Sequence, residues 1–391
     1  MKRKAIVCVV TRNYGHFALA LAESVAQHEP DVDYFVCFVD RPSFDCESAF
    51  EGRGKVFYAD QLGIPQWNRF AFQYTPFELS CALKPAALKH VADQGYEQIV
   101  YLDGDMRLQG SLDAVWEALD HSSIVLTPHL LKPFPDDGGR PGENLFLMAG
   151  TFNAGFVAIS NDENSQGFID WWSKCLAKQG HKDLAGSLFV DQKWLSLVPG
   201  LFPSVHLLRD PGYNTGHWTI AQYPLSFADD GKPSIGSHEI RLFHFSNLSP
   251  GGLGEYDHCQ DRTTYADEPV LQHLVKEYHE AIGRYEQVFA SESTCDFATC
   301  HSGTEIHPAW REAIRRDHPL FRSIEDPFEV GSQPLLLAKF RSVEGKAKKW
   351  RQDWRLKGIP STNEKQQDGT KRLKRQVKKI LRSFTKRKKA A

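Results

Sequence analysis

Short apolar runs alternate with stretches of helical periodicity along the first 180 residues. The runs are too short for buried helices and read as strands: they cover residues 5–10, 33–40, 99–102, 123–128 and 151–160. After the first run, a polar turn leads into a helix with Leu19, Leu21, Ala22 and Val25 at helical spacing. Continuously apolar strands that alternate with helices predict an α/β fold around a largely parallel sheet.

Further helices are expected at residues 77–91, 111–119 and 168–176. Pro85 stands inside the first of these, where proline kinks a helix and costs several kcal/mol unless packing compensates, so we expect a geometric demand there. Residues 129–146 form a loop rich in proline, glycine and charge. It is longer than a structural connection needs, and such loops often cover a site.

Two carboxylates separated by one residue follow the strand at 99–102. Asp103 and Asp105 stand at its carboxyl end, where ligands bind in open α/β sheets, and Gly104 between them lets the backbone approach a phosphate. Together they can bind one Mg²⁺ or Mn²⁺ that bridges a diphosphate. Taken alone, the tripeptide fits equally well a turn that merely ends a strand.

Polar residues at other strand ends extend this candidate site. Asp40 occupies the position that often addresses a ribose or base, although it also suits a turn cap. Lys84 could point at a diphosphate or be an ordinary exposed lysine. Asn153, in an Asn-Ala-Gly turn opening a strand, offers a donor and an acceptor to sugar hydroxyls. His244 could complete an Asp, Asp, His metal site or be a core histidine.

The composition fits one large or two modest globular domains: 391 residues, 41% apolar and 12% aromatic. No apolar run approaches the roughly 20 residues that a membrane span needs, and the start lacks a secretion signal. Eight scattered cysteines, several in strand-like runs, fit a reducing compartment. We therefore expect a cytoplasmic protein.

Charge is distributed unevenly along the chain. Residues 341–391 carry 19 Lys or Arg against 4 Asp or Glu, whereas the rest carries 28 against 45. Within 371–389, eleven basic residues accompany an apolar stripe made of Leu373, Val377, Ile380, Leu381 and Phe384. This pattern predicts an amphipathic helix on an anionic membrane surface, in preference to a nucleic-acid contact. A plain solvated tail is the alternative.

One cysteine-histidine group invites a metal interpretation. The segment CDFATCH contains Cys295, Cys300 and His301, and its spacing departs from that of a haem attachment site. A structural zinc site would need a fourth ligand, such as His258 or Cys259.

Several motifs in order carry a family resemblance. YLDGDMRL, FNAGFVAIS, FVDQKWLSLVPGLF, LRDPGYNTGHW and LFHFS follow one another over a region that covers roughly residues 5–330. This series resembles the retaining glycosyltransferases of the glycogenin and lipooligosaccharide galactosyltransferase type, and a bacterial glycosyltransferase-like group. The resemblance implies the GT-A fold, a Rossmann-like mixed sheet flanked by helices, here with a helical C-terminal extension and a basic tail.

The resemblance also implies roles for particular residues. Asp103, Asp105 and His244 would bind Mn²⁺ or Mg²⁺, while Asp191 and Gln192 would face the sugar and its anomeric centre. The candidate cofactor-binding residues are Thr11, Asn13, Asp40, Lys84, Asp103, Gly104 and Asn153. The implied donor is a nucleotide-diphosphate sugar, expected to be a UDP-hexose, and the implied acceptor is a cell-surface glycan or a lipid-linked sugar.

We expect three parts along the chain: a catalytic domain at 1–250, an extension packed on it at 251–340, and the basic tail at 341–391. Three other classes compete with a glycosyltransferase. A nucleotidyltransferase normally begins with a glycine- and arginine-rich loop, which VTRNYGHF lacks. A glycosidase needs carboxylates on opposite sides of a sugar, and Asp103 and Asp105 share one turn. A non-catalytic sugar-binding module would bind metal without releasing nucleotide.

Overall fold

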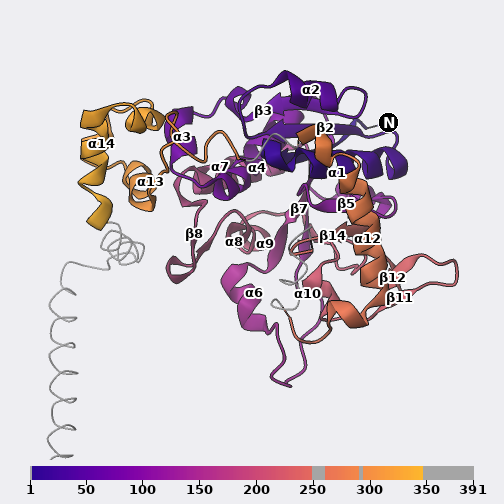
Figure 1. The fold of residues 1–391 in the computed structure, drawn as a ribbon. Helices are drawn as coiled ribbons and strands as arrows, with labels where there is room; N and C mark the ends of the chain where they lie inside the picture. Colours follow the sequence, from indigo (N-terminus) through magenta and orange to yellow (C-terminus); the bar gives the residue numbers. More distant parts are fainter. Residues whose placement is uncertain (1, 249–259, 290–293, 347–391) are drawn as a thin grey trace, which may run out of the picture. The chain divides into compact units, whose positions relative to one another are not determined.

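The computed structural model describes residues 2–248, 260–289 and 294–346 (Figure 1). Its centre is a seven-stranded sheet of order β10-β6-β7-β4-β1-β2-β3. The strands are β1 (Lys4–Val10), β2 (Asp33–Phe38), β3 (Lys55–Tyr58), β4 (Gln98–Leu102), β6 (Ile124–Pro128), β7 (Phe152–Ser160) and β10 (Val205–Leu207). Strand β7 runs antiparallel to both of its neighbours, and the other pairs are parallel. The predicted mixed α/β sheet is confirmed.

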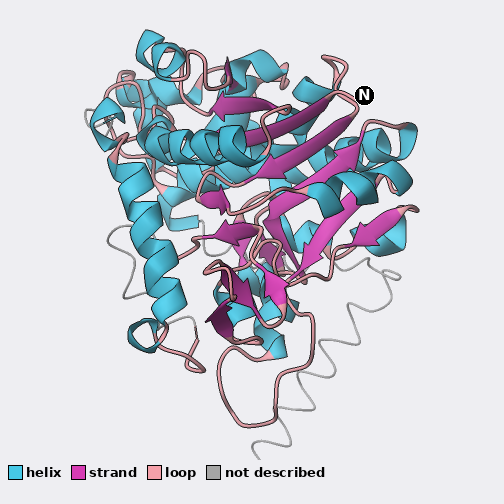
Figure 2. Cartoon of the chain, turned by 90° about the vertical axis from the view of Figure 1, so that its right-hand side faces the viewer, coloured by secondary structure: helices cyan, strands magenta, loops and turns pink. Residues whose placement is uncertain are grey.

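Helices cover both faces of this sheet (Figure 2). On one face, α1 (Gly15–His28) and α5 (Asp113–His121) bury alternate strand residues such as Ile6, Cys8 and Val10. On the other face, α4 (Pro76–Ala92) and α7 (Glu163–Gln179) contact each other, and α4 packs on β1. Burial on both faces explains why these strands are continuously apolar in the sequence.

Helix α4 matters most for the site because it carries Lys84. It begins with a capping box: the Glu78 backbone N–H donates to Thr75 Oγ1, and the Thr75 N–H donates to the Glu78 carboxylate. Pro76 occupies the first turn, where its missing N–H costs nothing. Pro85 lies inside the helix, as the sequence indicates, and is buried with the neighbouring Lys84.

Two local predictions are wrong. Residues 129–146 are not entirely loop, because α6 (Glu143–Ala149) begins within them. The Asn-Ala-Gly segment at 153–155 is not a turn but part of β7, which pairs with β4 and β6 on both sides. The ladder pairs of β7 stand on either side of this segment, at Phe152 and from Phe156 on, while the Ala154 N–H and carbonyl bond to the Gln192 and Lys84 side chains. These contacts hold the segment extended against the turn preference of Asn and Gly.

Smaller elements lie beside the sheet edge that carries Asp103 and Asp105. A two-stranded ribbon pairs β5 (Met106–Leu108) with β14 (Leu242–His244). The remaining short elements are α2 (Phe44–Ala49), α3 (Trp67–Phe72), β8 (Lys182–Asp183), β9 (Leu188–Phe189), α8 (Gln192–Leu195), α9 (Val198–Leu201), α10 (His217–Ile220), β11 (Leu225–Phe227), β12 (Pro233–Ile235) and β13 (His238–Glu239).

The C-terminal part of the described chain is helical: it comprises α12 (Pro269–Gly283), α13 (Pro308–Arg315) and α14 (Pro334–Arg341). Helix α12 packs its apolar face against α1 and the β14 region, with Leu271, Leu274 and Tyr278 fully buried. Residues 1–344 form one compact unit, and the domain limits at 250 and 340 stay a prediction. The amphipathic stretch at 371–389 lies outside the described residues. In the described ranges no helix has the length and apolar character to cross a bilayer.

Candidate active site

The turn between β4 and β5 presents Asp103 and Asp105 at the carboxyl end of β4. The Asp103 backbone N–H donates to the Gly155 carbonyl (2.9 Å), which ties the turn to β7. A side chain at Gly104 would not fit, because its Cβ would lie 2.7 Å from Val10 Cγ1. The sequence DGD therefore folds as a tight turn held between β1 and β7.

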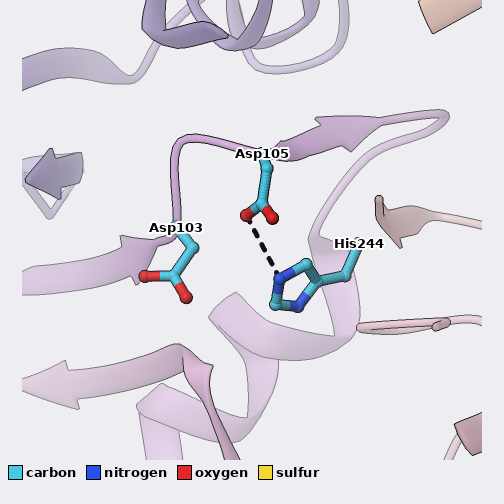
Figure 3. Close-up of side chains that lie close together, drawn as sticks. All are labelled: Asp103, Asp105 and His244. Carbon is cyan, nitrogen blue, oxygen red and sulfur yellow. Dashed lines mark ion pairs between the residues drawn. The ribbon is translucent and has the colours of Figure 1, made fainter. Parts of the chain in front are cut away.

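His244 reaches the same point from a distant part of the chain. Strand β14 pairs antiparallel with β5, with His244 opposite Met106, and the Phe245 N–H donates to the Asp105 carbonyl (2.9 Å). The His244 Nε2 atom then lies 3.2 Å from Asp105 Oδ1 (Figure 3). The ligand atoms of Asp103, Asp105 and His244 all lie within 4.8 Å of one another. The structure thus brings the three predicted metal ligands together.

The donor set fits a divalent ion. Two carboxylates and one imidazole suit Mn²⁺ well, since carboxylate oxygens favour Mg²⁺ and Mn²⁺ and imidazole suits transition metals. Burial opposes ionisation of Asp105, but His244 beside it holds the pKa of that carboxyl below its usual range. Burial likewise opposes charge on His244, but Asp105 raises its pKa. Among the residues that the structure describes, Asp103, Asp105 and His244 form the one cluster of three potential metal ligands.

Lys84 is buried at the centre of the site. Its Nζ lies 2.9 Å from Asp103 Oδ1 and 3.0 Å from Asp191 Oδ2, and it donates to the Ala154 carbonyl (3.0 Å). Burial alone would lower the pKa of Lys84, but the two carboxylates raise it, so the ammonium stays charged. The alternative of an ordinary exposed lysine is wrong.

Asp191 and Gln192 stand at the start of α8. Asp191 is 1% exposed; burial raises its pKa, and the Lys84 ammonium opposes that rise. The Gln192 side chain is held by backbone groups: its Oε1 accepts from the Ala154 N–H (3.3 Å), and its Nε2 donates to the Ala149 carbonyl (3.2 Å). Both residues are therefore fixed in place before any ligand binds.

Two cavities meet at the acid pair and at Lys84. One, of about 770 Å³, also contains Asn153, Asp191, Gln192 and His244 and extends between α6, α8 and α10. The other, of about 710 Å³, extends to the first turn and contains Thr11, Asn13 and Gly104. The structure thus gathers nearly all the predicted site residues around two connected spaces.

Asp40 is the exception, because it lines neither of these cavities. It is 2% exposed, and its two carboxylate oxygens accept from the backbone N–H groups of Arg12 (2.6 Å) and Asp296 (2.7 Å). Burial raises the pKa of Asp40, which these amides oppose. The bonds fit the alternative of a turn cap, which here ties the first turn to the segment at 294–298.

Several residues of the site were not anticipated. His129, His217 and Trp218 line the larger cavity. Asn214 hydrogen-bonds to Nδ1 of His244, the ring nitrogen that does not face Asp105. Burial lowers the pKa of His129 to about 3 and that of His217 to about 4, so both rings are neutral. Asn214, His217 and Trp218 all lie in the DPGYNTGHW segment, which is the sequence signal for them, whereas His129 is the first residue of the stretch at 129–146 and has no comparable signal.

The Cys295, Cys300 and His301 group does not converge on a common point. Both ring nitrogens of His301 are engaged, one with Asp326 (3.0 Å) and the other with Arg41 (3.2 Å). The further zinc ligands considered from the sequence, residues 258 and 259, lie outside the described residues.

Comparisons with known proteins give no matching family model. The chain is 27% identical over 209 residues to the uncharacterized protein YfnF of Bacillus subtilis (strain 168), a match that covers 51% of this chain and 66% of that protein. It is 22% identical over 256 residues to YfnD of the same strain, a match that covers 64% of this chain and 80% of that protein.

Among solved structures, the chain is similar to the galactosyltransferase LgtC in complex with donor and acceptor sugar analogs. The two share 16% sequence identity, the match covers 72% of this chain and 95% of that chain, and the TM-score is 0.44.

Proposed function

We propose that this protein is a metal-dependent glycosyltransferase of the GT-A type. It transfers a hexose from a nucleotide-diphosphate sugar, in our proposal UDP-hexose, to a cell-surface glycan or a lipid-linked acceptor. The observation that carries the proposal is the convergence of Asp103, Asp105 and His244 where two cavities meet. A donor that spans both cavities would place its diphosphate at this junction.

A Mn²⁺ or Mg²⁺ ion held by Asp103, Asp105 and His244 would offset the charge that develops on the departing diphosphate. Thr11 and Asn13 line the cavity that would receive the nucleoside. Lys84 binds both Asp103 and Asp191, so its positive charge lies between the two carboxylates and fixes their spacing. Asn153 and Gln192 line the other cavity, where the donor sugar would lie.

The reaction breaks the bond between the anomeric carbon and the diphosphate oxygen and forms one to an acceptor hydroxyl. The acceptor's proton passes to the leaving phosphate, so no strong protein base is required, and we propose front-face attack with retention. The Asp191 carboxylate, paired with Lys84, can stabilise positive charge at the anomeric carbon. Its service as a covalent nucleophile is the alternative.

Asp191→Asn and Gln192→Ala should lower kcat by roughly 10²-fold with little change in the KM for the donor, because groups at the reaction centre act mainly in the transition state. Steady-state kinetics with saturating Mn²⁺ measures both constants. Asp170→Asn, an exposed acid on α7, is the matched control. A raised KM with an unchanged kcat would place both residues in ground-state binding instead.

The function itself is tested by incubating the purified protein with a panel of nucleotide sugars and Mn²⁺. Multi-turnover release of nucleoside diphosphate, together with sugar appearing on an added acceptor, is the expected result. Metal and donor binding without release would indicate a non-catalytic module. Formation of a sugar nucleotide from a sugar phosphate and a nucleoside triphosphate would indicate a nucleotidyltransferase.

We also propose that the basic stretch at 371–389 holds the enzyme on the inner face of the cytoplasmic membrane. The support is its sequence pattern: eleven basic residues with one apolar stripe. Deleting residues 365–391 should abolish co-sedimentation with vesicles containing anionic lipid and leave transfer to a soluble acceptor analogue unchanged. Vesicle binding that survives the deletion would refute the anchor.

A further inference from the structure

A buried chain of hydrogen bonds leads away from the candidate metal site on the far side of the His244 ring. The Nδ1 atom of His244 lies 3.2 Å from Asn214 Oδ1. Asn214 Nδ2 donates to Thr127 Oγ1 (2.7 Å) and to Asn153 Oδ1 (3.2 Å). Asn153 Nδ2 in turn lies 3.2 Å from His129 Nε2. These side chains are between 2% and 6% exposed, so water does not compete for their bonds.

One backbone group fixes the direction of every bond in this chain. The Gly155 N–H donates to the side-chain atom of Asn153 that faces it (2.9 Å). A backbone N–H cannot accept a hydrogen bond, so that atom must be the carbonyl oxygen of the Asn153 amide. The same oxygen faces Asn214, which must therefore present its NH₂ group there.

The orientation of Asn214 then determines the tautomer of His244. With its NH₂ group committed to Asn153 and Thr127, Asn214 turns its oxygen toward His244. An oxygen only accepts, so Nδ1 of His244 must carry a proton. In a neutral imidazole the lone pair then lies on Nε2, the nitrogen that faces Asp105 and the ligand cluster. The reverse orientation of Asn214 would set two amide oxygens 3.2 Å apart.

We propose that Asn214 is a positioning residue, which together with Asn153 and the Gly155 amide presets His244 as a metal ligand. The inference rests on the metal site of the proposed function and deepens it. Metal-binding histidines commonly depend on such a partner for their second nitrogen. Asn153 keeps one further N–H and lines the larger cavity, so it can still meet a donor sugar.

The backbone at these positions is specialised for this arrangement. Asn214 has a φ of 56°, the left-handed region that asparagine tolerates better than most residues. Gly155 leaves room for the His244 ring, because a Cβ there would lie 2.5 Å from His244 Cε1. Trp218 packs edge-on against the same ring with centroids 5.4 Å apart. The ring is thus held by packing as well as by its hydrogen bond.

Mn²⁺ binding to the full chain, measured by the electron paramagnetic resonance signal of free Mn²⁺, tests the proposal without any sugar transfer. Asn214→Gly removes the amide while keeping a residue that accepts the left-handed backbone. It should raise the Kd for Mn²⁺ by roughly 10- to 100-fold. The matched control is Ser187→Gly, which also replaces a left-handed residue (φ 60°), just before β9, and should leave the Kd unchanged.

A second readout follows the imidazole itself. Electron spin-echo envelope modulation from the ring nitrogen should be present in wild type and Ser187→Gly, and weakened in Asn214→Gly and His244→Ala. Unchanged Mn²⁺ affinity and nitrogen modulation in Asn214→Gly would overturn the proposal, even if its Tm fell, and so would a wild-type protein without nitrogen modulation. A protein that shows the expected Mn²⁺ pattern but transfers no sugar would refute the proposed activity and leave the role of Asn214 standing.

Discussion

Replacing either acid of the turn, as Asp103→Asn or Asp105→Asn, should lower kcat by about a thousandfold, which is the scale for losing a principal charge stabiliser. Each change removes an anionic oxygen without changing side-chain volume. The two acids contribute two of the three converging ligand atoms. His244 already supplies the third, and the Lys84 ammonium has no lone pair to offer a metal, so neither can take the place of a lost carboxylate. EDTA should likewise abolish wild-type activity, and added Mn²⁺ should restore it.

The measurement is nucleoside diphosphate release as a function of Mn²⁺ concentration. Asp93→Asn is the matched control. Asp93 is an exposed acid whose ion-pair partner, Lys89, lies one helical turn before it. Circular dichroism and Tm should show that all three variants are folded. Full activity of Asp103→Asn or Asp105→Asn in EDTA would remove the metal from the mechanism.

Of the variants proposed here, Lys84→Met should lose the most stability: its free energy of unfolding should fall by about 3 kcal/mol. The ammonium binds Asp103 and Asp191, and Asp191 has a side chain only 2% exposed. Removing the cation leaves Asp191 as an uncompensated buried charge. The Asp103 side chain is 29% exposed, so water partly screens its charge. The expected loss of unfolding free energy is therefore near the lower end of the range for breaking a buried ion pair.

The loss should depend on pH in a defined direction. Burial raises the pKa of Asp191, and without Lys84 the opposing effect disappears. A carboxyl whose folded-state pKa is raised destabilises the fold increasingly as the pH rises through that pKa. Lys84→Met should therefore lose more stability at neutral than at acidic pH, as measured by urea unfolding.

A double-mutant cycle separates charge from packing. In Lys84→Met combined with Asp191→Asn, the buried carboxylate is neutralised, so part of the stability should return and the pH dependence should flatten. If the double variant is no more stable than Lys84→Met at any pH, packing of the lysine stem, and not its charge, holds this region together.

Five of the seven strands could be predicted from the sequence because they are buried on both faces and therefore read as continuous apolar runs. The short outer strands β3 and β10 are partly exposed and show no such run, so the sequence did not predict them. Strands β1, β2, β4, β6 and β7 appear within a few residues of their predicted bounds. Asp103 and Asp105 were found for a related reason. A polar pair directly after a buried strand can lie only at the sheet edge, where ligands bind.

Tertiary pairing accounts for what the sequence did not show. His244 joins the acids only because β14 pairs with β5, across more than 130 residues. Lys84 could not be told from an exposed lysine until α4 was placed against Asp103 and Asp191. Asp40 occupies the predicted strand end, but the segment at 294–298 folds back and supplies the amide that it binds. The role of Asn214 depends on three bonds to distant residues.

The central claim is that one divalent ion, bound by Asp103, Asp105 and His244, holds the diphosphate of the donor between the two cavities. A crystal structure with Mn²⁺ and UDP, using the anomalous signal of manganese, tests it most directly. We expect one anomalous peak in contact with the three side chains and the diphosphate, with the nucleoside in the cavity lined by Thr11 and Asn13. UDP bound elsewhere, or a manganese peak away from these three residues, would contradict the account.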